Sequence, residues 1–400
     1  MNNRLTRFLT GRDLVFVAIF TALSVWFYIG FYFPSLYILS SGGVPKTILW
    51  ILRIVIPLLY VGVIILYISV RRNLVGTREL GILLVSVSFS MIVCYGIADA
   101  LYQKRFDDYR KLYHPFLQLM PSLDRRLEGS GIHGGRIFCL GGSTTELPDR
   151  SGRDWPSRVE AILRKESGFQ DVEVYNLGRE WYTSLHTLIN YETNLRKYRP
   201  SAIVIMQSVN DLLQNADFSY MSHGAFREDY GHFYGPVNRI IERRTLYQYL
   251  HYVLRELWYA RPRTTITTDQ FPGLNAYRSN IETIIEMARH DSTKVILMTE
   301  PYLMKRKMSE EEHSVIGMIK VEAINDEVVW SSETLVNGME HYNNTLRSIA
   351  ITYNLPLIDL EKEVPKSLIY FRDEVHYQDT TFSIVAPFVA HKLLEYLTPN

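Results

Sequence analysis

Residues 136–145 read RIFCLGGSTT, and this stretch decides the fold. Its first five residues are mostly apolar and rich in strand formers, which indicates a buried strand. Two glycines then allow a sharp turn, and residues 155–165 have the pattern of a helix. A serine between a strand and a helix lies near free backbone N–H groups, which favour negative charge. The junction therefore predicts an α/β unit with a polar site at the end of its strand.

Similar strand–helix units follow along the chain. Strands are expected at 172–177, 202–206, 294–298 and 355–359, and helices at 184–198, 274–289, 341–353 and 381–397. Nearly continuous apolar character in such strands indicates a parallel sheet with helices on both faces. The expected fold class is α/β, a three-layer α/β/α, flavodoxin-like domain around a parallel five-stranded sheet. In such sheets, ligands bind beyond the carboxyl ends of the strands.

Three long apolar segments occupy the first hundred residues, at 14–33, 48–70 and 80–101. Each is long enough to cross a hydrocarbon layer of about 30 Å as a helix. Aromatic side chains such as Trp26 and Trp50 lie near the segment ends, as at membrane interfaces. Three transmembrane helices are therefore expected before the α/β domain. Buried helices of a soluble domain would explain three runs of this length poorly.

Basic residues give an expected orientation, because cytoplasmic loops are enriched in them. Three arginines precede the first segment and three lie between the second and third, at positions 4, 7, 12, 71, 72 and 78. The N-terminus of this multi-pass protein is therefore expected in the cytoplasm and the large domain outside it. Four basic residues follow the third segment, at positions 104, 105, 110 and 111, and they favour the opposite orientation.

The chain is expected to divide into a membrane domain (1–103), a juxtamembrane linker (104–135) and an α/β domain (136–400). Two insertions, 212–270 and 302–339, interrupt the alternation of strands and helices. Both leave the sheet at its carboxyl edge, where a lid or cap over a substrate would lie. Ordinary packing and solvated helices explain the insertions equally well.

Composition argues against several classes of protein. A formal net charge of +1, with no basic stripe, argues against a nucleic-acid partner. Cys94 and Cys139 belong to no CxxC or Cys/His cluster, so no zinc site is expected. The EEEH run at 310–313 is interpreted as a solvated helical face. No phosphate-binding glycine motif follows Gly142, and no cofactor or metal is expected.

A second polar segment, Asp373-Glu374-Val375-His376, precedes the final helix. A serine hydroxyl becomes a nucleophile when a base takes its proton. Histidine can be that base if a carboxylate holds its other ring nitrogen. Ser143, Asp373 and His376 are therefore candidates for a catalytic triad, and Gly178 and Asn210 also follow expected strands.

These residues lie in four ordered blocks: LGGSTT with Ser143, YNLGRE with Gly178, SVNDL with Asn210, and RDEVHY with Asp373 and His376. From about 136 to 397 the chain resembles the SGNH (GDSL-like) serine hydrolases, which are named for a serine, a glycine, an asparagine and a histidine in such blocks. Each block is short, so the resemblance depends on their combination and order.

The resemblance implies a role for each of these residues. Ser143 would be the nucleophile, His376 the general base and later the general acid, and Asp373 the group that orients the histidine. The backbone N–H groups of Ser143 and Gly178, with the Asn210 side chain, would form an oxyanion hole. Each such donor is typically worth roughly 3 kcal/mol in the transition state.

The sequence departs from the family pattern at two positions. Gly142 replaces the aspartate that is common in the first block, and Ser208 replaces the glycine that commonly begins the third. The triad does not need that aspartate, but Ser208 adds bulk near the oxyanion hole. The α/β-hydrolase pattern GxSxG is excluded, because Thr145 occupies the position of its last glycine.

The expected function is hydrolysis of acyl esters through an acyl-serine intermediate, with O-acetyl esters of cell-surface carbohydrate as substrates and the lipid bilayer as a partner. An O-acyltransferase could use the same triad to modify a cell-envelope glycan. That alternative implies a membrane partner, because three spans seldom bring acyl donors across a membrane unaided. A third alternative, an inactive glycan-binding or scaffold protein, is favoured by Gly142 and Ser208 and opposed by the intact triad.

Overall fold

The computed structural model describes residues 112–114, 116–122, 126–129, 135–215, 264–316 and 328–398, with scattered single residues between 62 and 104. The chain divides into two units, 1–108 with 243–261, and 109–242 with 262–400. All elements named below belong to the second unit. Within the described residues, no helix combines the length and the apolar character that crossing a bilayer requires. The three expected membrane spans fall, apart from scattered positions, outside the described residues, and the domain boundaries stay a prediction.

The centre of the described fold is a five-stranded parallel sheet. Its strands are β3 (Arg136–Gly141), β4 (Glu173–Asn176), β5 (Ala202–Met206), β7 (Lys294–Met298) and β9 (Leu357–Ile358). They lie in the order β4-β3-β5-β7-β9, with every neighbouring pair parallel. The strand order reverses between β3 and β5, and such a switch point is where doubly wound sheets bind ligands. The predicted α/β fold with a parallel five-stranded sheet is confirmed.

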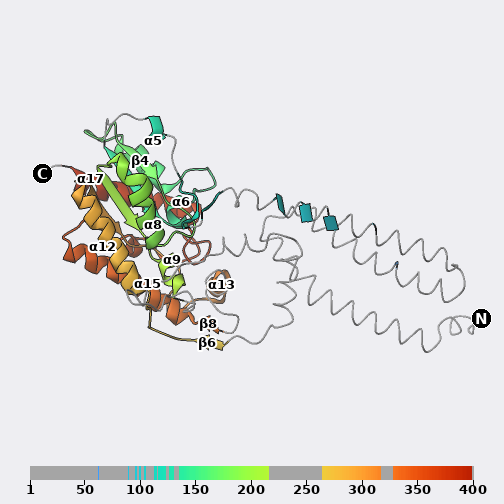
Figure 1. Cartoon of the computed structure of the whole chain (residues 1–400). Helices are drawn as coiled ribbons and strands as arrows, with labels where there is room; N and C mark the ends of the chain where they lie inside the picture. Colours follow the sequence, from blue (N-terminus) through green and yellow to red (C-terminus); the bar gives the residue numbers. More distant parts are fainter. Residues whose placement is uncertain are drawn as a thin grey trace, which may run out of the picture. The chain divides into compact units, whose positions relative to one another are not determined.

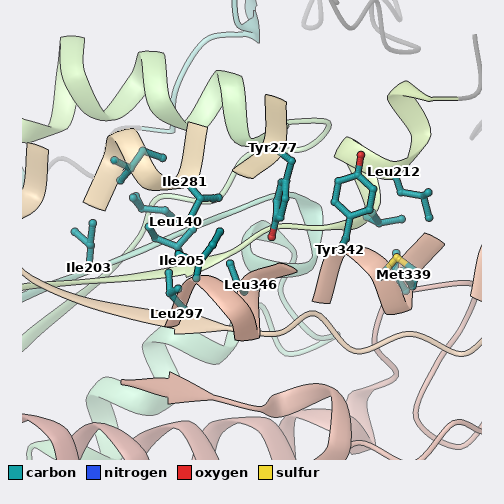
Figure 2. Packing of buried hydrophobic residues seen from close by; sticks show 14 of the residues in the cluster. Leu140, Ile203, Ile205, Leu212, Tyr277, Ile281, Leu297, Met339, Tyr342 and Leu346 are labelled. Atoms are coloured by element: carbon teal, nitrogen blue, oxygen red, sulfur yellow. The ribbon is translucent and has the colours of Figure 1, made fainter. Parts of the chain in front are cut away.

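Successive side chains of each strand point to opposite faces of the sheet. On one face of the sheet, a core forms between the strands and three helices, α8 (Ser184–Asn190), α12 (Leu274–His290) and α15 (Ser332–Thr352). Phe138 and Ile203 are among the strand residues that point into it. Cys139 and Val204 join a second core with α7 (Trp155–Leu163) and α17 (Phe382–Leu397). Figure 1 shows α12 and α15 side by side. Figure 2 shows side chains of the first core, among them Leu140, Ile205, Leu297, Tyr277, Ile281 and Leu346.

Two helices differ from their predicted extents. Helix α15 begins at Ser332, because the Ser331 side chain accepts a hydrogen bond from the Thr334 N–H and caps the helix. Residues 332–339, which the sequence analysis placed in the second insertion, therefore belong to a helix of the core. The helix predicted at 184–198 is divided into α8, the π-helical η2 (Tyr191–Leu195) and the 3₁₀ turn η3 (Arg196–Tyr198).

Two small sheets were not predicted, because strands of two or three residues have no measurable periodicity. Strands β6 (Thr264–Ile266) and β8 (Val328–Trp330) pair in parallel, so the ends of the two insertions lie together. Strands β1 (Tyr113–His114) and β2 (Gln118–Leu119) form a hairpin. The other elements are α5 (Arg126–Gly129), α6 (Ser143–Glu146), α9 (Val209–Gln214), α13 (Glu310–Val315), α16 (Leu360–Glu363) and η5 (Asp379–Thr381).

The sequence suggested that the EEEH run at 310–313 is a solvated helical face, but the structure shows that part of this run is buried. Glu312 is buried at the start of α13. Its side chain accepts a hydrogen bond from the Ser309 N–H at 2.9 Å and one from Lys305 Nζ at 2.6 Å. The run therefore has a capping role, which a Ser-x-x-Glu pattern can indicate.

Candidate active site

Ser143 is the first residue of α6, directly after β3. A sharp turn at Gly142 leads from the strand into this short helix. A Cβ atom at position 142 would lie 2.9 Å from Asn210 Nδ2, which is closer than side chains normally approach. Glycine at this position therefore allows the Asn210 side chain to lie against the turn that presents the serine.

His376 and Asp373 lie in the loop before η5 and α17, and His376 reaches Ser143 across 233 residues of chain. The distance from His376 Nε2 to Ser143 Oγ is 2.8 Å. The other ring nitrogen, Nδ1, lies 2.9 Å from Asp373 Oδ2 and 3.0 Å from Oδ1. An ionised carboxylate can only accept, so Nδ1 carries the proton and Nε2 is left to accept from the serine hydroxyl.

Asp373 keeps its negative charge in this loop. Burial raises the pKa of its carboxyl, but hydrogen bonds from the His376 ring and from two backbone N–H groups outweigh burial and lower the pKa below its ordinary value. Those N–H groups belong to Val375 and His376, at 3.1 and 2.8 Å from Oδ1. The charge can therefore hold the imidazole ring and stabilise its protonated form.

Two predicted oxyanion donors, Asn210 and Gly178, also reach this edge of the sheet. Asn210 lies in the first turn of α9, where its Nδ2 atom donates to the Tyr182 carbonyl at 2.9 Å. An amide NH₂ carries two hydrogens, so one more can be donated. Gly178 follows β4, and its N–H donates a hydrogen bond to Asn176 Oδ1 at 3.2 Å, so this predicted donor already has an acceptor within the fold. A Cβ at Gly178 would lie 2.7 Å from Thr145 Cβ, so this glycine lies directly against α6.

Ser208, the second departure from the family pattern, uses its side chain away from Asn210. It is buried, and its hydroxyl lies 3.1 Å from Asn343 Oδ1 on α15. The same hydroxyl donates to the Gln207 carbonyl at 2.6 Å, so the added side chain has hydrogen-bond partners within the core. All five predicted site residues lie at or beside α6, and their catalytic roles remain predictions.

Several residues of the site were missed in the sequence. Glu146, the last residue of α6, accepts hydrogen bonds from Arg179 Nη1 and from the Glu180 N–H, both at 2.5 Å. Asn176 Nδ2 donates to the Thr145 carbonyl at 2.9 Å. These contacts join the end of β4 and the segment after it to α6, the helix that begins at Ser143. The sequence could have indicated Glu146, Asn176 and Arg179 through their closeness to the ends of β3 and β4.

Two buried carboxyl groups lie behind the site. Glu300 follows β7 and accepts hydrogen bonds from Thr144 Oγ1 and the Val209 N–H. Asp211 accepts from the Ser184 N–H at 2.9 Å and from Ser184 Oγ at 2.5 Å. Burial raises the pKa of Asp211 to about 7, although the hydrogen bonds from Ser184 oppose this change.

A cavity of about 540 Å³ lies beside α6. Most of its lining residues are polar, and the lining consists of Ser122, Glu146, Leu147, Pro148, Asp154, Asn176 and Glu180. Burial and the neighbouring Glu146 carboxylate raise the pKa of Glu180, while His376 and two arginines oppose the change. Among the described residues, no group of three histidine, cysteine or acidic side chains is arranged to hold a metal ion.

The model of the GDSL-like Lipase/Acylhydrolase family matches residues 139–380 of this chain. The chain belongs to that family. The matched range contains all five predicted site residues, four complete strands of the sheet and the second half of β3. The enzyme class expected from the sequence, a serine hydrolase acting on ester bonds, is confirmed. No curated protein matches the sequence.

Solved structures that are similar to this GDSL-like protein have low sequence identity to it. A GDSL-like lipase from Bacteroides thetaiotaomicron is 13% identical, with 68% of this chain and 95% of that chain covered and a TM-score of 0.38. A lipase/acylhydrolase from Enterococcus faecalis is 16% identical, with coverages of 66% and 98% and a TM-score of 0.39. A catalytic mutant of an acetylxylan esterase from Geobacillus stearothermophilus is 14% identical, with coverages of 66% and 96% and a TM-score of 0.40.

Proposed function

We propose that Ser143, His376 and Asp373 are the catalytic triad of this esterase. The observation that supports the proposal is the unbroken chain of contacts from Ser143 Oγ to His376 Nε2 and from Nδ1 to Asp373. The Oγ–Nε2 distance of 2.8 Å lies within the range that proton transfer requires.

In the proposed reaction, Ser143 Oγ attacks the ester carbonyl while His376 Nε2 takes the hydroxyl proton. The resulting oxyanion is stabilised by the Asn210 amide and by the backbone N–H of Ser143. The Gly178 N–H joins them when it turns from Asn176 Oδ1 to the oxyanion. The protonated His376 then gives its proton to the leaving alcohol, and an acyl-serine remains. Water, deprotonated by His376, attacks the acyl carbonyl, and the acid leaves as Ser143 regains its proton.

We propose O-acetyl esters of carbohydrate as the substrates. The support is the polar cavity beside α6, which is lined by Glu146 of that helix but by no residue of the proposed triad. Its carboxylate and amide groups would hydrogen-bond well to a hydroxyl-rich alcohol. Its carboxyl groups also disfavour an anionic alcohol, which like charges would repel.

We propose that the segments 14–33, 48–70 and 80–101 anchor the enzyme in a membrane, with the N-terminus in the cytoplasm and the catalytic domain outside. The support is their apolar length and the distribution of basic residues in the sequence. Two measurements test this proposal. The full-length protein should stay with membranes after alkaline carbonate extraction, and protease added to intact cells should cleave the catalytic domain. Release by carbonate would contradict the anchor.

The catalytic proposal is tested with Ser143→Ala in the full-length protein. We expect this variant to lower kcat for a small aryl acetate by at least about 10⁴-fold, because the nucleophile is lost. Glu312→Gln, a buried glutamate of α13, is the control and should keep wild-type turnover. Wild-type turnover in Ser143→Ala would reject the proposed nucleophile. Wild-type enzyme should also release free acetate from an O-acetylated polysaccharide without an added acceptor, which a transferase would require.

A further inference from the structure

Glu300 is a buried carboxylate that belongs to none of the four sequence blocks. It lies two residues after β7, and only 2% of its surface is exposed. Its Oε1 atom accepts a hydrogen bond from Thr144 Oγ1 at 2.8 Å. Its Oε2 atom accepts one from the Val209 N–H at 2.9 Å. Each oxygen of one carboxylate therefore holds a different segment of the chain.

The two segments that Glu300 joins are those of the nucleophile and of the amide donor. Thr144 directly follows Ser143, and Val209 directly precedes Asn210. The paired residues of β3 and β5 end at Gly141 and Met206, before either functional residue. Beyond the sheet, the Glu300 carboxylate is therefore a direct link between these two segments.

The backbone of Glu300 is itself fixed by Asn343, a buried residue of α15. The Glu300 N–H donates to Asn343 Oδ1 at 3.0 Å, and the Glu300 carbonyl accepts from Asn343 Nδ2 at 3.0 Å. Ser208 Oγ also lies 3.1 Å from Asn343 Oδ1. The link is thus anchored to a long core helix, which limits how far the carboxylate can shift.

Burying this carboxylate has an energetic cost. Burial raises the pKa of Glu300. Hydrogen bonds from the Val209 backbone, from Thr144 and from the Ser208 backbone, together with the nearby His376, oppose the change. A buried polar group that only filled space would be replaced without loss by an apolar one. Glu300 instead satisfies two donors that would otherwise be buried without a partner.

We propose that Glu300 is a positioning residue for ester hydrolysis, which sets the spacing between Ser143 Oγ and the Asn210 amide by holding Thr144 and Val209. The inference rests on the proposed triad. Catalytic groups must keep their productive geometry to within about 0.5 Å. A misplacement of about 1 Å can lower a rate by about 100-fold. The effect is expected in kcat rather than in KM, because the oxyanion forms only after substrate has bound.

The test compares three substitutions in the full-length protein. Glu300→Leu removes both hydrogen bonds. Glu300→Gln can keep both, because its carbonyl can accept from the Val209 N–H and its amide can donate to Thr144 Oγ1. Thr144→Val removes the hydrogen bond from Thr144 to Glu300 with little change of shape. This variant tests the inference if Glu300→Leu does not fold. Glu312→Gln is again the control, as a buried glutamate outside the site.

With an aryl acetate as substrate, we expect Glu300→Leu to lower kcat by about 100-fold and Thr144→Val by about 10-fold, both with KM unchanged. Glu300→Gln should retain kcat to within about 3-fold, because the hydrogen bonds rather than the charge set the spacing. Wild-type kcat in both Glu300→Leu and Thr144→Val would overturn the inference. An equal loss in Glu300→Gln and Glu300→Leu would also overturn it, because the charge would then be the essential feature.

Failure of this inference can be told apart from failure of the proposed triad. If Ser143→Ala keeps its activity, the triad is wrong. If Ser143→Ala is inactive while the Glu300 and Thr144 variants behave as wild type, only the positioning role is wrong.

Discussion

Carboxyl groups in two regions of this enzyme have pKa values that move in opposite directions from their ordinary values. In the final loop, Asp373 receives hydrogen bonds from an imidazole ring and two backbone N–H groups, and its pKa is lowered. Near α6 and α9, burial prevails over hydrogen bonding, and the pKa values of Asp211 and Glu300 are raised. The Asp373 side chain keeps 25% of its surface exposed and receives a hydrogen bond from the His376 ring, whereas Asp211 and Glu300 are almost fully buried. Burial and hydrogen-bond donors together therefore set the direction in which each pKa moves.

The difference separates a charge that serves the reaction from carboxyl groups that hold the scaffold. The reaction needs a negative charge beside His376 when the ring becomes protonated. Asp211 and Glu300 instead accept hydrogen bonds from segments that the reaction requires to stay in place. Substitutions that remove charge but keep shape should therefore have unequal effects in the two regions.

The largest effect is expected in the final loop, from Asp373→Asn. Its amide can keep the hydrogen bonds from the backbone, but it cannot favour the proton on Nδ1 of His376 or stabilise the protonated ring. We expect kcat for an aryl acetate to fall by about 10⁴-fold. Steady-state kinetics of the full-length protein would check this. A loss no greater than that of Glu300→Gln would remove the distinction between the two regions.

A smaller effect is expected where the second region depends on packing. In Gly142→Ala, the added methyl group would lie 2.9 Å from Asn210 Nδ2 and must displace the amide. We expect kcat to fall by about 10- to 100-fold with little change in KM.

A double-mutant cycle supplies the control for Gly142→Ala. In an Asn210→Ala background, the methyl group has room, so the same change should cost almost nothing. An equal loss in both backgrounds would show that the methyl group acts on something other than Asn210.

The smallest effect is on stability and concerns Asp211. Its pKa is about 7 in the folded protein, above the ordinary value of 3.8, so the folded state holds a proton that the unfolded state has released. The stability that this group contributes is present at acidic pH. It is lost as pH rises from about 4 to about 7, by at most about 1.4 kcal/mol per pH unit.

Asp211→Asn should remove this dependence, because the amide does not titrate and can still hydrogen-bond to Ser184. We expect the thermal midpoint of the wild type to fall more between about pH 5 and about pH 8 than that of the variant. Parallel curves for the two proteins would show that Asp211 titrates normally.

The sequence predicted the sheet because its strands are continuous apolar runs, which only a buried parallel sheet explains well. It also placed Ser143, Gly178 and Asn210 correctly after successive strands. Glu300 follows β7 in the same way and was missed, since a single glutamate after a strand carries no motif. Its partners, Thr144 and Val209, are identified only by three-dimensional contact.

Other features were missed because they depend on local geometry. The start of α15 depends on the cap at Ser331, which the apolar periodicity does not show. The reason for glycine at position 142 is the approach of Asn210, 68 residues away in the chain. In the sequence, Gly142 looked like the loss of a family aspartate. The structure shows that glycine at this position makes room for the Asn210 side chain.

The central claim is that Ser143 carries the covalent intermediate. The most direct measurement is to label the full-length protein with a fluorophosphonate and to locate the adduct by mass spectrometry of its peptides. We expect the adduct on the peptide that contains Ser143, and no labelling in Ser143→Ala. An adduct on another residue, with Ser143 unmodified, would contradict the claim.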